Sequence, residues 1–186
     1  MAEEILNNTA ESKGLGARLT EFGPTPRGDS SRGRATRTII QEDAANRREG
    51  AATGLKVLVV EDSVADLNTC VGLLQKIGVQ QVDACSNVPA GLLRLEEMLE
   101  GKLPHPDVII VDLAFPIESG FEILRFWKSH PELKSIPVIV WTVMGDTEQQ
   151  LCRAFGVHRV VPKWADRAEL EAAVVEAAKL SSGKTD

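Results

Sequence analysis

The sequence is short of the residues that mark secreted, membrane-spanning and nucleic-acid-binding proteins. It has 3 cysteines, Cys70, Cys85 and Cys152, and an odd number without paired spacing does not make a disulfide framework or a zinc site. No stretch approaches the roughly 18 apolar residues of a membrane span, and the first residues lack the apolar core of a secretory signal. With 21 Lys and Arg against 27 Asp and Glu, the net charge is -6. We therefore expect a cytoplasmic protein that binds neither membrane nor nucleic acid.

What is present fits one folded domain with an extension. Hydrophobic residues make up 43% of the chain and charged residues 26%, as in ordinary globular domains. Residues 1–54 are rich in glycine, proline and serine and poor in large apolar side chains, so we expect a largely disordered extension there, with a short helix as an option around 38–48. The folded domain is expected at 55–181, followed by a tail at 182–186.

From residue 55 onwards, strand and helix patterns alternate five times. The predicted strands are short and apolar, at 56–61, 81–85, 107–111, 137–142 and 159–161. The predicted helices follow them at 64–77, 88–100, 120–129, 147–155 and 169–180. A βα barrel needs eight such units. We therefore predict an α/β fold of the flavodoxin-like, doubly wound type: a five-stranded parallel sheet in the order 2-1-3-4-5, with helices on both faces.

Polar residues stand at the carboxyl ends of four predicted strands. Glu61 and Asp62 follow the first strand, Asp112 the third, Thr142 the fourth and Lys163 the fifth. Each alone reads equally well as a helix cap, a turn residue or a solvated side chain. In a parallel sheet, however, these ends meet at one edge, where crowded carboxylates repel one another unless a cation lies among them. A few hard oxygen ligands with room for water and phosphate describe a Mg²⁺ site.

Four segments carry a resemblance to a known family. They are VLVVEDS at 57–63, VDLAFPIESG at 111–120, PVIVWT at 137–142 and VVPKW at 160–164. With them, the chain from about Leu55 to Leu180 resembles the receiver domain of bacterial response regulators. The second segment is the most specific, because the acceptor aspartate, the proline four residues on and the glycine eight residues on all match.

The resemblance implies a phosphoryl-transfer role for three residues. Asp112 corresponds to the phosphoacceptor, and Thr142 to the switch hydroxyl that turns toward the phosphoryl group. Lys163 corresponds to the ammonium that pairs with a phosphoryl oxygen. The implied donor is a phosphohistidine on a histidine kinase or phosphotransfer protein, and a carboxylate is a chemically competent nucleophile for it.

The resemblance also implies a metal site. Glu61, Asp62 and Asp112 correspond to the acidic ligands of Mg²⁺, with Glu61 acting through water. The backbone carbonyl of Ala114 completes the set. The sequence leaves open whether Mg²⁺ or Mn²⁺ is used.

The switch region departs from the family in two places. The family has lysine followed by proline, often with a cis bond, whereas here Pro162 precedes Lys163 and Trp164 follows. Cis costs about 2.5–4 kcal/mol at a non-proline bond, so we expect a trans bond or a strained one. Val160 stands where the family has its aromatic switch residue. Trp141 or Trp164 could replace that ring, although packing is the expected role of both.

The surroundings of the acceptor also differ from the family. Val143 replaces a small residue after Thr142, and a β-branched side chain there narrows access to the phosphoryl group. Ala114 and Met144 flank the site, and neither can orient an attacking water by hydrogen bonding. We therefore expect slow loss of phosphate, over many minutes or longer.

Three readings of function follow. The leading one is a single-domain response regulator, not an enzyme beyond slow autodephosphorylation, whose output is an unknown downstream protein or a homodimer. The alternative is a receiver-like binding module that is never phosphorylated, which Val160 and the Pro162-Lys163 order favour. A small hydrolase working through an aspartyl-phosphate is the third reading, but it needs a general acid at the position of Ala114.

Overall fold

The computed structural model describes residues 35–39, 54–143 and 145–182, except for the side chains of 35–39 and 182. Its strands are β1 (Ala35–Ile39), β2 (Lys56–Val60), β3 (Gln81–Cys85), β4 (Val108–Val111), β5 (Val138–Thr142) and β6 (Arg159–Pro162). Its helices are α1 (Val64–Lys76), α2 (Val88–Leu99), α3 (Phe121–Ser129), α4 (Asp146–Phe155) and α5 (Arg167–Ser182), with a 3₁₀ turn at Leu133–Ser135. The elements predicted after residue 55 are all found, with bounds shifted by one or two residues; only the 3₁₀ turn was not predicted.

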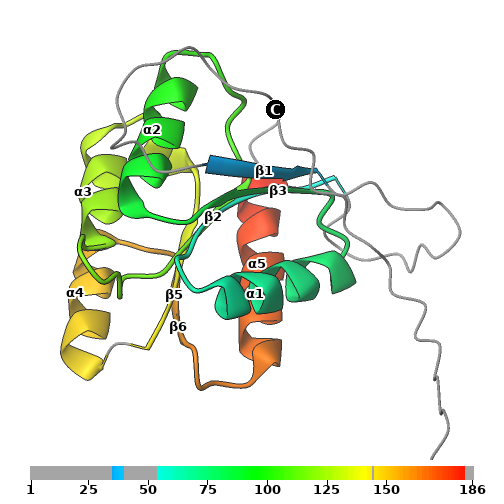
Figure 1. The fold of residues 1–186 in the computed structure, drawn as a ribbon, viewed down its shortest axis with the longest axis vertical. Coiled ribbons are helices and arrows are strands. Elements are labelled where there is room, and N and C mark those ends of the chain that lie inside the picture. The colour runs from blue at the N-terminus through cyan, green and yellow to red at the C-terminus, as the bar shows by residue number, and fades with distance from the viewer. Residues whose placement is uncertain (1–34, 40–53, 144, 183–186) are drawn as a thin grey trace, which may run out of the picture.

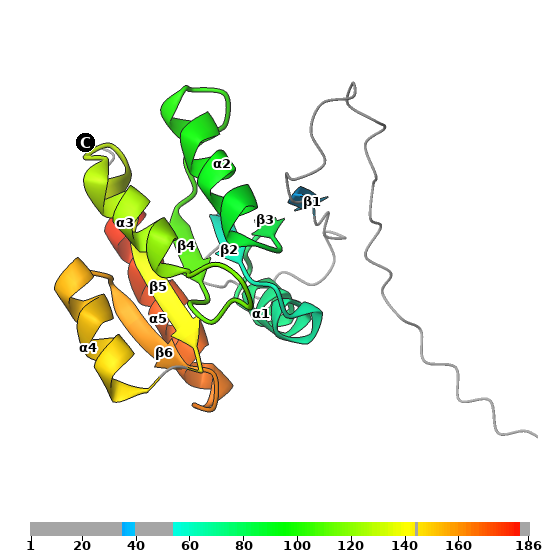
Figure 2. The ribbon, with the colours of Figure 1, turned by 60° about the vertical axis from the view of Figure 1, so that its left-hand side comes forward.

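The sheet has the predicted order. It is six-stranded, β1-β3-β2-β4-β5-β6, and the last five strands are parallel to one another. Numbered among themselves, those five follow the order 2-1-3-4-5, so the flavodoxin-like prediction is confirmed. Figures 1 and 2 show this twisted sheet in the middle of the molecule.

The first strand was not predicted. β1 pairs antiparallel with β3, from Ala35 opposite Cys85 to Ile39 opposite Gln81, and Figure 2 shows it at the β3 edge of the sheet. The sequence predicts a largely disordered extension here, with a short helix as an option around 38–48. An isolated five-residue strand has no fold of its own, and only the free edge of β3 gives its backbone hydrogen-bond partners. The rest of the extension lies outside the described residues.

Local signals set the ends of the helices. Ser63 and Asn87 cap α1 and α2, accepting hydrogen bonds from the backbone of Asp66 at 3.3 Å and Ala90 at 2.8 Å. After α4, Gly156 takes a left-handed φ of 85°, which glycine adopts without a steric penalty. These caps explain why the sequence placed the helices closely.

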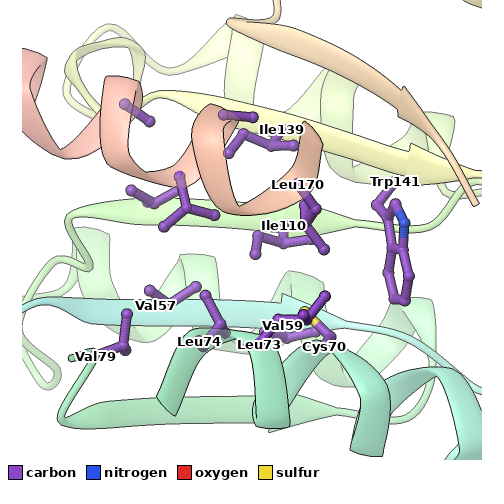
Figure 3. Close-up of a cluster of buried hydrophobic side chains, with 14 of the residues drawn as sticks. Val57, Val59, Cys70, Leu73, Leu74, Val79, Ile110, Ile139, Trp141 and Leu170 are labelled. Atoms are coloured by element: carbon purple, nitrogen blue, oxygen red, sulfur yellow. The ribbon is translucent and has the colours of Figure 1, made fainter. Parts of the chain in front are cut away.

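The helices cover both faces of the sheet, with α1 and α5 on one face and α2, α3 and α4 on the other (Figure 1). The first face buries an apolar cluster that includes Val57, Ile110 and Leu74, seen in Figure 3 between the strands, α1 and α5. The second face buries Leu58 and Ile109 with residues of the other helices. Because β2, β4 and β5 are buried on both faces, their polar residues can lie only at the strand ends.

Within the part of the chain that the structure describes, no helix combines the length and apolar character needed to cross a bilayer.

Candidate functional site

Backbone hydrogen bonds bring the carboxyl ends of the strands together. Glu61 N donates to Cys85 O at 2.9 Å, and Asp112 N donates to Val60 O at 3.0 Å. Such bonds continue the ladder one residue beyond β2 and β4, so both acidic side chains leave the sheet from fixed positions. Glu61 is 1% exposed and Asp112 3% exposed.

Glu61, Asp62 and Asp112 form a group able to hold a cation. One carboxylate oxygen of each lies within 4.8 Å of the others. Three acids this close, two of them buried, repel one another unless a positive charge is present. Hard carboxylate oxygens beside solvent are the ligands of Mg²⁺, so the residues fit this ion. The role of the Ala114 carbonyl stays a prediction.

The backbone orients the Asp112 carboxylate. Its Oδ1 accepts hydrogen bonds from Leu113 N at 2.6 Å and from Ala114 N at 3.0 Å. Gly120 lies directly behind this turn, and a Cβ built there would stand 2.1 Å from Asp112 O. The glycine of the 111–120 segment is thus required by close backbone approach, since its φ of -58° is open to any residue.

Lys163 supplies the positive charge of the site. Its Nζ donates to Asp112 Oδ2 and to Asp66 Oδ2, each at 2.7 Å, and lies 2.8 Å from Glu61 Oε2. Burial lowers the pKa of this ammonium, but the bonds to Asp112, Asp66 and Glu61 outweigh it and raise the pKa above its ordinary value. Lys163 therefore stays charged at neutral pH.

For Glu61, the effect of burial outweighs that of the neighbouring charges, so the neutral form is favoured. Loss of water around the buried carboxyl raises its pKa from 4.5 to about 7, although Lys163 and the Ser63 N–H pull it down and Asp112 adds to the rise. Without a metal, part of the Glu61 population is therefore protonated near neutral pH.

Thr142 lies at the end of β5. Its Oγ1 is buried and has no hydrogen-bond partner among the described residues, which is unusual for a buried hydroxyl. Lys163 N donates to Thr142 O at 2.9 Å, so the two residues are held side by side. Val143 is 56% exposed at the rim. Met144 lies outside the described residues.

The structure answers the expectations for the residues around Lys163. No described peptide bond is cis, so the bond from Lys163 to Trp164 is trans, as expected. Trp141 is buried and its ring centroid lies 5.2 Å from Lys163 Nζ, whereas Trp164 is 65% exposed. Packing is confirmed for Trp141, but the prediction that Trp164 packs was wrong. Val160 is half-buried against the α2–α4 side of the sheet.

Asp66 is a residue of the site that the sequence alone did not reveal. This residue is in the first turn of α1, three positions after the capping Ser63, and its side chain is 39% exposed. An acid at that position is common in helices because it favours the positive end of the helix dipole. Only the folded structure shows that the Asp66 carboxylate also contacts the Lys163 ammonium.

Comparison with known proteins agrees with this geometry. The family model described as the response regulator receiver domain matches residues 57–175 of the 186. The chemotaxis protein CheV1 of Helicobacter pylori is 31% identical over 113 residues, covering 58% of this chain and 33% of that protein. The protein PilG of Pseudomonas aeruginosa is 32% identical over 92 residues, covering 50% and 63%. The matched region is thus a third to two thirds of these relatives.

Solved structures share the fold. A receiver domain of a signal transduction histidine kinase from Syntrophus aciditrophicus has a TM-score of 0.55 and 28% identity, covering 71% of this chain and 93% of that one. A response regulator receiver domain from Clostridium thermocellum has a TM-score of 0.59 and 27% identity, covering 69% and 97%. Motifs, site geometry and family match agree, and the chain belongs to the response regulator receiver domain family of two-component signalling.

Proposed function

We propose that Asp112 accepts a phosphoryl group from a phosphohistidine of a histidine kinase or phosphotransfer protein. The observation that supports this is the convergence of Asp112, Glu61, Asp62 and Lys163 at one sheet edge. Receiver domains interact with such donors as a family, and they act as signalling domains rather than as turnover enzymes. The identity of this chain's donor is part of the proposal.

The chemical step is an in-line displacement. An Asp112 carboxylate oxygen forms a bond to phosphorus while the bond from phosphorus to the donor imidazole nitrogen breaks, and the electron pair returns to that nitrogen. The backbone N–H groups of Leu113 and Ala114 hold the carboxylate for attack. When bound, Mg²⁺ held by Glu61, Asp62 and Asp112 would neutralise charge on the phosphoryl oxygens.

Two further residues respond to the phosphoryl group. Lys163, already 2.7 Å from Asp112 Oδ2, can transfer that contact to a phosphoryl oxygen. Thr142 Oγ1, a hydroxyl without a partner among the described residues, gains an acceptor once the phosphoryl oxygens arrive. The new hydrogen bond would favour a second arrangement of the loop after β5.

The output is proposed to pass through the face formed by α4, β6 and α5. In the chain, α4 follows Thr142, β6 leads into Lys163 and α5 follows it, so a change at these two residues can reach this face and alter its binding to a downstream protein or a second copy. Val160, in place of an aromatic residue, removes a ring that could swing. The switch therefore acts through the loop after Thr142 rather than through ring rotation.

Loss of phosphate is proposed to be slow, over many minutes or longer. Ala114 has no side-chain group that could orient a water, and the β-branched Val143 stands at the rim. A half-life of seconds for the isolated phosphoprotein would contradict this expectation.

The experiment that tests the function is intact-mass spectrometry after incubation with phosphoramidate and Mg²⁺. We expect a gain of one phosphoryl group in the wild type, and no gain when EDTA is present from the start or in Asp112→Asn. A folded protein that gains no mass would instead support the alternative, a receiver-like binding module that is not phosphorylated. Val160 is the observation that favours that alternative.

A further inference from the structure

The ammonium of Lys163 contacts three carboxylates, and they are not equivalent. Glu61 and Asp112 belong to the group that fits a metal, and Asp112 is also the proposed acceptor. Asp66 lies outside that group, on α1, yet its Oδ2 is 2.7 Å from Lys163 Nζ. An ammonium has three donors. Asp66 is therefore the contact that does not change when metal and phosphoryl group engage the other two acids.

The start of α1 leaves Asp66 available for this contact. In a capping box, the acid three residues after a capping serine reaches back to the serine N–H. Here Ser63 N donates instead to Glu61 Oε1 at 3.0 Å, while Ser63 Oγ accepts from Asp66 N at 3.3 Å. The Asp66 backbone is fixed by the cap, and its carboxylate is directed to a residue 97 positions away.

The Lys163 side chain is 8% exposed, and among the described residues three carboxylates contact its ammonium. Its own backbone N is bound to Thr142 O at 2.9 Å, but the next residue, Trp164, is 65% exposed and follows a trans bond. The Trp141 ring, 5.2 Å away, supports the ammonium from below without directing its donors. A lysine side chain has four rotatable bonds, and fixing it costs up to about 2 kcal/mol of rotamer entropy.

We propose that Asp66 is a positioning residue for Lys163, holding its ammonium at the Asp112 carboxylate before and after phosphoryl transfer. This inference rests on the proposed function and adds a residue to it. The residue after Lys163 is tryptophan rather than proline, so no proline ring restrains the backbone there. The Asp66 carboxylate restrains the lysine through its side chain instead. Asp66 is not one of the three acids able to hold a metal, Glu61, Asp62 and Asp112.

The test compares the phosphorylation rates of variants with that of the wild type. Phosphoramidate is the donor, Mg²⁺ is present, and intact-mass spectrometry measures the phosphorylated fraction over time at several donor concentrations. Asp66→Ala should lower the maximal rate on the order of three- to tenfold, because a misdirected ammonium loses transition-state stabilisation. Asp66→Asn keeps an acceptor oxygen and should stay within about twofold of the wild type. Glu96→Ala, which removes an exposed acid on α2, is the matched charge control and should change nothing.

Two readouts separate positioning from simple stabilisation of α1. In a Lys163→Ala background, Asp66→Ala should have no further effect on the rate, because the partner of Asp66 is gone. The Mg²⁺-induced rise in melting temperature should be the same in Asp66→Ala as in the wild type, since Asp66 lies outside the metal group.

Each outcome is decisive. If Asp66→Ala lowers the melting temperature but leaves the phosphorylation rate unchanged, Asp66 only supports its helix and the inference fails. An equal slowing with and without Lys163 overturns it as well. If the wild-type chain takes up no phosphoryl group at all, the proposed function itself fails, and this inference with it.

Discussion

At the carboxyl ends of β2 and β4, a buried apolar residue is followed directly by a carboxylate that is buried almost as fully. Val60 is 0% exposed and the next residue, Glu61, is 1% exposed; Val111 is 0% exposed and Asp112 3% exposed. Burying the valines stabilises the fold by about 25 cal/mol per Å² of apolar surface. Burying the neighbouring carboxylates costs free energy unless a cation compensates.

The contrast assigns different tasks to the two regions, the apolar interior of Figure 3 and the acidic strand ends. The interior provides the stability, and the strand ends hold negative charges that Lys163 balances in part and that a bound cation would balance further. Changes in the interior should therefore unfold the protein, whereas changes at the strand ends should alter its chemistry and can even relieve repulsion.

The largest expected effect lies in the interior. Ile110→Ala in β4 should lower the free energy of unfolding by about 2–5 kcal/mol, because it leaves a cavity between the sheet and the helices. Asp112→Asn, two residues further along, keeps an acceptor oxygen and removes one crowded charge, so it should change stability by less than about 1 kcal/mol. Urea denaturation measures both, and equal losses would remove the contrast.

Lys163→Met should come next. It keeps the length of the side chain but leaves buried Glu61 and Asp112 without their ammonium, at a cost of about 2–4 kcal/mol near pH 8. Mg²⁺ should restore part of this stability. Lys102→Met is the control, because that lysine pairs with Glu100 on an exposed surface and should show no measurable change.

Gly120→Ala probes the backbone packing behind the acceptor. The added Cβ would stand 2.1 Å from Asp112 O and 2.7 Å from the Leu113 Cα, so the turn must shift. This shift should lower the free energy of unfolding by about 1–3 kcal/mol. Phosphorylation should slow in parallel. Gly72→Ala in α1 has open space around the new Cβ and should stabilise by about 0.5–1 kcal/mol. Wild-type-like melting of Gly120→Ala would show that the turn adapts freely.

The smallest effect is a pH dependence. The folded-state pKa of Glu61, about 7, lies above its ordinary 4.5 because burial disfavours the charge. Its contribution to stability is therefore full below about pH 4.5 and is lost as pH rises through 7. In EDTA, wild type should lose about 1–2 kcal/mol relative to Glu61→Gln between pH 5 and 8, with screening by solvent included. Parallel stability curves would contradict this cause.

Sequence reasoning reached most of the fold because the apolar periodicity, the capping Asn87 and the glycine after α4 are local signals. It also predicted that the polar strand ends converge, since parallel strands must end at one edge. It missed β1, whose backbone finds hydrogen-bond partners only at the free edge of β3, far along the chain. It missed the Asp66 contact because that bond joins positions 97 residues apart.

The proposal that Asp112 carries the phosphoryl group is testable on the intact chain. The wild type is phosphorylated with phosphoramidate and Mg²⁺, the acyl phosphate is reduced with borohydride, and the reduced residue is mapped by peptide mass spectrometry. We expect reduction at position 112 alone, and none when Mg²⁺ is left out of the phosphorylation. Label at another carboxylate, or no label in the folded protein, would contradict it.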